Sequence, residues 1–143
     1  MWKGLYDTFL QLVATRWSNY LAANGSCGQA VRNNFQNQVY PEAGIILIIT
    51  TLAVSLLYYY YLNFKFGRYY SLTSWFWMML TNSLIIGVIT YFITRGNLGK
   101  PMCPVSNYII WMGIINSVYG VLLFFLVSLV LKIKSPMGKK TPF

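Results

Sequence analysis

The chain has 143 residues, of which 57% are hydrophobic and only 9% are charged. Because about a quarter of the residues in an ordinary soluble domain are charged, this composition excludes that class and indicates an integral membrane protein. The net charge of +9 could suggest nucleic acid, but the basic residues form no stripe interleaved with aromatic side chains, so we expect no nucleic-acid partner and assign them to the lipid surface.

Residues 1–23 predict an amphipathic helix. At about 100° per residue, Trp2 and Trp17 fall within one broad apolar arc. Charged residues interrupt the apolar run, so we expect no cleavable signal peptide. The helix should lie in the membrane interface, where Lys3 and Arg16 reach lipid head groups. Docking of the apolar face on a partner subunit and a fourth, poor span are the alternatives.

Residues 24–42 are polar, rich in Asn and Gln, and predict a loop. They begin with the turn composition Asn-Gly-Ser-Cys-Gly. Its first three residues match a glycosylation sequon, although a tripeptide this common is more often only a turn. Pro41 and Glu42 suit the first turn of a following helix.

Residues 44–62 form the first predicted span. Thr51 and Ser55 lie four residues apart on the face that also carries Gly44. Small residues on one face allow a second helix to approach closely, so Thr51 and Ser55 are candidates for helix packing.

Residues 71–94 form the second predicted span, which has two polar faces and no charged side chain before Arg95. One face is a candidate lining of a lumen, or a contact with another subunit, and carries Ser71, Ser74, Met78 and Asn82. The other face is a candidate for close helix packing and carries Ser83, Gly87 and Thr90. Two such faces predict two helical neighbours, so this span should be the middle of the bundle.

Residues 108–131 form the third predicted span, with small and polar residues along one side. Asn116 and Ser117 join the candidates for a lumen or subunit contact, whereas Gly113 and Gly120 join the candidates for helix packing.

The predicted fold class is therefore an all-α integral membrane protein, with three transmembrane helices preceded by an N-terminal amphipathic interfacial helix. About 20 apolar residues cross a bilayer, and each span meets that length. We divide the chain into a helix and polar loop over 1–43, a three-span bundle over 44–131 and a basic tail over 132–143.

The basic residues favour one orientation. The side that holds the tail carries more of them, and the positive-inside rule places that side in the cytoplasm and the N-terminus outside. The membrane would be a bacterial inner membrane or an equivalent organelle membrane. The tail's candidates for lipid head-group contact are Lys132, Lys134, Lys139 and Lys140.

This topology puts Cys27 and Cys103 on the same, oxidising side. A disulfide between them is one prediction. Closing a loop of about 75 residues would stabilise the fold by roughly 4 to 4.5 kcal/mol in the chain-entropy model. Two unrelated free thiols are the alternative.

The chain has few side chains for catalysis. It has no His and only two carboxylates, Asp7 and Glu42. General acid–base catalysis needs a titratable group near the working pH, and a metal site needs clustered ligands. We therefore expect no enzyme, no metal and no cofactor.

Two functions fit the spans. In the first, copies of the chain assemble into a pore or ion channel lined by uncharged side chains such as Asn82 and Asn116. In the second, the chain is a non-catalytic accessory subunit of a larger membrane complex. The simplest role of the two amides is to bond neighbouring helices. Because all three spans carry small or polar faces, we expect self-association or other membrane subunits as partners.

Overall fold

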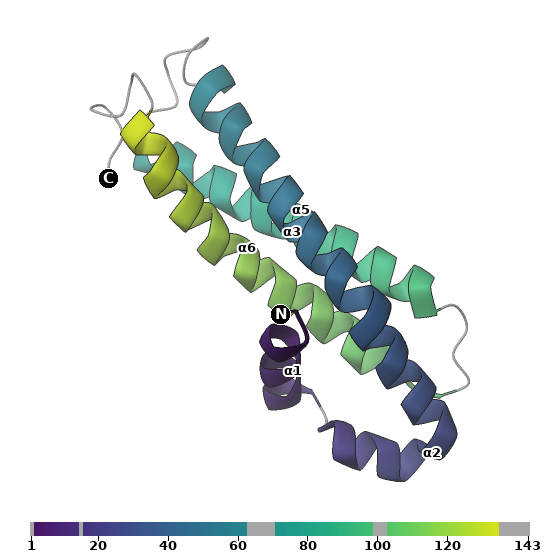
Figure 1. Cartoon of the computed structure of the whole chain (residues 1–143). Coiled ribbons are helices and arrows are strands. Elements are labelled where there is room, and N and C mark those ends of the chain that lie inside the picture. Colours follow the sequence, from purple (N-terminus) through teal and green to yellow (C-terminus); the bar gives the residue numbers. More distant parts are fainter. Residues whose placement is uncertain (1, 15, 63–70, 99–102, 135–143) are drawn as a thin grey trace.

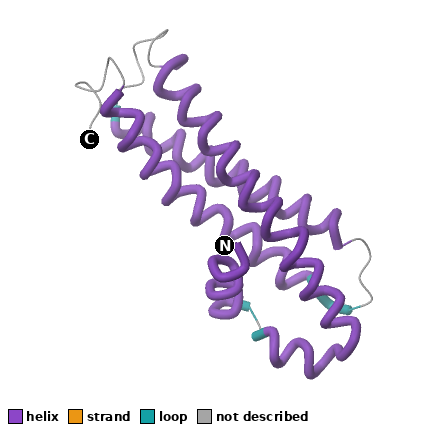
Figure 2. The backbone as a smooth tube through the Cα atoms, viewed as in Figure 1, coloured by secondary structure: helices purple, strands orange, loops and turns teal. Residues whose placement is uncertain are grey.

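The computed structural model describes residues 2–14, 16–62, 71–98 and 103–134, and every regular element in these ranges is helical (Figures 1 and 2). In chain order, the elements are α1 (Trp2–Val13), α2 (Trp17–Asn34), the π-helical turn η1 (Phe35–Val39), α3 (Tyr40–Leu56), the π-helical turn η2 (Leu57–Leu62), α5 (Leu72–Leu98) and α6 (Ser106–Lys134).

Three of these helical stretches are long and apolar enough to cross a membrane, namely Trp17–Leu62, Leu72–Leu98 and Ser106–Leu131. This confirms the predicted all-α class with three candidate spans. The second and third helices extend beyond the predicted 71–94 and 108–131. They lie side by side with α3, which contacts both of them (Figure 1).

The structure replaces the predicted loop over 24–42 by helix, so that α2, η1 and α3 follow one another without a linker (Figure 2). At the position of the predicted turn the structure has a kink at Gly25, whose φ of 52° suits glycine. Beyond the kink, the chain stays helical because Val31, Phe35 and Val39 recur every four residues and are all buried. The many Asn and Gln residues conceal this apolar stripe in the sequence.

A proline marks the change from η1 to α3. Pro41 has no backbone N–H, and its ring crowds the carbonyl four residues earlier. The turn before it, Phe35–Val39, is π-helical. A wider turn accommodates the proline without ending the helix.

The predicted N-terminal helix over 1–23 is two helices rather than one. Tyr6 and Leu10 of α1 are fully buried, and α1 lies against α6 and α3 (Figure 1). Trp17 and Tyr20 of α2 are also buried, and their rings contact Tyr108. The first helix ends at Val13 and a second helix begins at Trp17.

Small residues allow α5 and α6 to pack most closely. A Cβ atom added at Gly87 would overlap the Ser117 hydroxyl and lie 3.3 Å from the carbonyl oxygen of Gly113. A Cβ atom at Gly113 would lie 3.2 Å from the carbonyl oxygen of Gly87. The Ser83 hydroxyl donates a 2.9 Å hydrogen bond to the carbonyl of Ser117 across the same contact.

Substitution of Gly87 tests this close approach. We expect Gly87→Ala to lower the free energy of unfolding by about 1 to 3 kcal/mol, because the added methyl group overpacks the contact with α6. Gly96→Ala is the matched control on the same helix, since no atom lies within 4 Å of its added Cβ. Detergent-based unfolding titrations compare the two variants, and equal stability would contradict the close packing.

Candidate functional site

Asn116 is the centre of the buried polar network, and it is fully buried. Its Oδ1 accepts a 2.7 Å hydrogen bond from the Tyr6 hydroxyl of α1. Its Nδ2 donates to the Ala43 carbonyl of α3 at 3.2 Å and to the Thr90 hydroxyl of α5 at 2.6 Å. One amide on α6 thus bonds the three other helices that surround it.

The Tyr6 hydroxyl donates one of the hydrogen bonds of this network and can do so only while it is protonated. Burial raises its pKa well above the usual value, and the neighbouring Tyr119 raises it further. The phenol therefore stays protonated throughout the physiological pH range. Tyr119 also donates a 3.0 Å hydrogen bond to the Leu5 carbonyl, so α6 holds α1 at two places.

Asn82 is the corresponding buried amide of α5 and is also fully buried. Its Nδ2 donates to the Thr51 hydroxyl of α3 at 3.4 Å and to the Gly120 carbonyl of α6 at 3.3 Å. Its Oδ1 has no hydrogen-bond partner, and neither has the buried Ser55 hydroxyl on α3. This second amide joins the three long helices but is less fully satisfied than Asn116.

The structure separates the residues that the sequence placed on one lumen-facing side of α5. Ser71 precedes the helix, and its hydroxyl accepts a 3.2 Å hydrogen bond from the backbone N–H of Ser74, as an N-terminal capping residue does. Met78 packs against the cluster around Trp75 and Phe124. Asn82 lies inside the bundle, so these positions do not form one open surface.

The packing candidates lie between the helices. Thr51 and Thr90 are buried, and their hydroxyls accept the amide hydrogen bonds of the network. Gly113 is buried beside Gly87, and Gly120 lies against Ile86.

Asp7 forms a second polar centre, which we did not predict. Its carboxylate accepts hydrogen bonds from Trp17 Nε1 at 3.2 Å, Gln36 Nε2 at 3.1 Å and the Tyr40 hydroxyl at 2.7 Å. These donors come from three successive segments, so Asp7 fixes α1 against the start of the long helix. Helical spacing places Asp7 on the polar arc of the predicted helix, so the sequence carried no signal for these three contacts.

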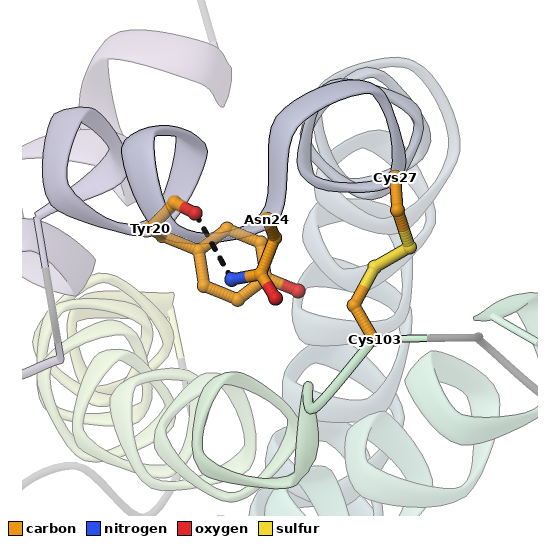
Figure 3. Close-up of a disulfide and its surroundings, with 4 residues drawn as sticks. All are labelled: Tyr20, Asn24, Cys27 and Cys103. Carbon is orange, nitrogen blue, oxygen red and sulfur yellow. Dashed lines mark hydrogen bonds between the residues drawn. A yellow bond between two sulfur atoms is a disulfide. The ribbon is translucent and has the colours of Figure 1, made fainter.

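The disulfide lies near Tyr20 and Asn24 of α2 (Figure 3), and both of its cysteines pack in or against the buried cluster that contains Tyr20. Cys27 and Cys103 are bonded, with their Cα atoms 6.4 Å apart. The bond joins α2, beyond its kink at Gly25, to the segment that leads into α6. Beside it, the Asn24 side chain donates a 3.0 Å hydrogen bond to the Tyr20 carbonyl.

The candidate head-group residues fall into two groups. Lys3 and Arg16 are exposed and line a surface depression of about 580 Å³ with Asp7, Gln11 and other residues of the α1–α2 junction. Lys132 and Lys134 belong to the last turns of α6, whereas Lys139 and Lys140 lie outside the described residues.

The two carboxylates of the chain serve as hydrogen-bond acceptors. Glu42 accepts a hydrogen bond from Asn97 Nδ2, which connects α3 to the end of α5. Asp7 is held by its three donors. Among the residues that the structure describes, no three His, Cys, Asp or Glu side chains gather in a way that could hold a metal ion.

Comparisons with known proteins found no matching family model, no matching curated protein and no matching solved structure.

Replacement of Asn116 tests the network. Asn116→Leu removes three hydrogen bonds, each worth about 0.6 kcal/mol between membrane helices, so we expect a loss of about 2 kcal/mol in the free energy of unfolding. Asn107→Leu is the control, because Asn107 is exposed on the same helix. If the two variants unfold alike in bicelles, Asn116 does not hold the helices together.

Reduction of the disulfide tests its structural role. We expect reductant to lower the free energy of unfolding by up to about 4 kcal/mol, because the bond closes a long loop. The double variant Cys27→Ser/Cys103→Ser should already have the lower stability and should not respond to reductant. Alkylation of both thiols in the untreated native protein, detected by mass spectrometry, would show that the bond is absent.

Proposed function

We propose that this chain is a non-catalytic structural subunit of a multi-subunit membrane complex. The observation that carries the proposal is the inward direction of the polar network. Asn82 and Asn116 are fully buried and bond to neighbouring helices of the same chain. Amides used in this way stabilise the bundle of one chain and are not free to line a lumen between copies.

The exterior supports insertion into a membrane. Large apolar side chains on all three long helices are more than half exposed, among them Ile49, Leu84, Phe92, Leu122 and Val130. Exposed apolar area of this extent belongs in lipid or against other membrane proteins. We therefore propose three membrane crossings.

The disulfide supports the proposed orientation. Disulfides persist in oxidising compartments, and Cys27 and Cys103 lie at the end of the bundle that also holds α2 (Figure 1). This end would face the outside, and the basic tail would lie in the cytoplasm. A bacterial inner membrane or an equivalent organelle membrane has this arrangement.

A row of amides offers a contact surface for other subunits. Gln29, Asn33 and Asn37 recur every four residues along α2 and η1, and all three are exposed. The row precedes the apolar part of α3, so it would lie outside the hydrocarbon region. It can hydrogen-bond a partner without burying a charge, which would be costly.

Co-purification tests the subunit role. Extraction in a gentle detergent should recover other membrane subunits at fixed stoichiometry by mass analysis. The double variant Asn33→Arg/Asn37→Arg should lose them, because it would bury two unpaired charges at the contact. Asn19→Arg is the control, since Asn19 is exposed on α2 before the kink at Gly25.

A flux assay separates this proposal from a pore. Liposomes that contain the purified protein should retain their ions. Ion conductance that changes in Asn82→Leu or Asn116→Leu would contradict the structural role and support a homo-oligomeric channel.

A further inference from the structure

The outer face of the α5–α6 pair carries an apolar groove of about 330 Å³. Gly87 and Gly113 lie where the two helices approach most closely, and the taller side chains of Val88, Phe92 and Ile114 flank them. The groove is within the size range of small-molecule sites in proteins. It lies outside the buried network, so neither Asn82 nor Asn116 contributes to it.

A second cavity of about 440 Å³ continues the groove toward the disulfide end. The two cavities share Tyr91 and Ile110, so they adjoin, and we treat them together as one depression. The second cavity is lined in part by Arg95 and Ser106, which gives it a cationic and polar end.

The two halves lie at different depths along the helices. Gly87 and Arg95 are eight residues apart, which is about 12 Å along an α-helix. Arg95 lies in the last turn of α5, whereas Gly87 is near its middle. A ligand that fills the depression would therefore be apolar beside Gly87, near the middle of α5, and anionic beside Arg95, in the last turn of α5.

Among the described residues, Arg95 forms no ion pair with Asp7 or Glu42. Glu42 accepts a hydrogen bond from Asn97, and Asp7 accepts three on α1. Arg95 is exposed, and a guanidinium can bind phosphate oxygens with two parallel hydrogen bonds.

We propose that this depression binds one anionic phospholipid, with an acyl chain along Gly87 and Gly113 and the phosphate at Arg95. The inference rests on the proposed membrane location. A second copy of the chain fits less well. Parallel copies that meet at this face would bring their Arg95 side chains together at the same depth, and like charges across an interface disfavour association.

Lipid retention in native mass spectrometry tests the site. The full-length protein in detergent is mixed with phosphatidylglycerol and phosphatidylcholine of the same acyl chains. We expect one phosphatidylglycerol to be retained per protomer, in preference to phosphatidylcholine. Arg95→Gln should weaken retention about tenfold, because it removes a charge-assisted hydrogen bond.

Val88→Trp should weaken retention to a similar degree by filling the groove. Val130→Trp is its matched control, since the two valines are 55% and 59% exposed and Val130 does not line the groove. Arg32→Gln is the control for Arg95→Gln, because Arg32 lies on α2 and does not line the depression.

Three results would overturn the site: equal retention of the two lipids, wild-type retention in Arg95→Gln, or equal effects of Val88→Trp and Val130→Trp. A cross-linked dimer through this face would also overturn it.

Carbonate extraction of cell membranes separates these results from a failure of the proposed location. A chain that is released by carbonate contradicts both the location and the site, whereas a retained chain without lipid preference contradicts the site alone.

Discussion

The hydrogen bonds of the Asn116 amide are the interaction on which the rest of the structure depends. A buried amide without partners costs several kcal/mol in an apolar environment, so the fold must bring donors and acceptors to it. Tyr6, Ala43 and Thr90 provide them from three different helices. These bonds tie α1, α3 and α5 to α6, and the hydrogen bonds of Asp7 and Tyr119 add to the placement of α1.

Close packing makes these short hydrogen bonds possible. Gly87 and Gly113 allow the backbones of α5 and α6 to approach, and Gly120 presents its carbonyl to Asn82. In lipid, helices gain little from hydrophobic burial against one another, so packing and hydrogen bonding have to supply the association energy. The buried amides of Asn82 and Asn116 thus bond helices of their own chain, and these bonds are the physical basis for proposing a structural rather than a pore-forming role.

The sequence was sufficient to predict the helical class and the three apolar helices, because length and composition determine them. It was misleading over 24–42, where Val31, Phe35 and Val39 were hidden among amides. It also could not show that Asn116 bonds Tyr6, since that contact joins residues 110 positions apart. Helical spacing predicts on which face of its helix a residue lies. Only the tertiary arrangement decides whether that face packs against another helix or is exposed.

A double-mutant cycle between Tyr6→Phe and Asn116→Leu tests this account most directly. The free energies of unfolding should show a coupling of about 0.6 kcal/mol or more, because the two side chains share a buried hydrogen bond. The coupling should not change when the protein is diluted, since both residues belong to the same chain. Additive effects, or a coupling that disappears on dilution, would contradict the view that the polar residues of this protein bind its own helices together.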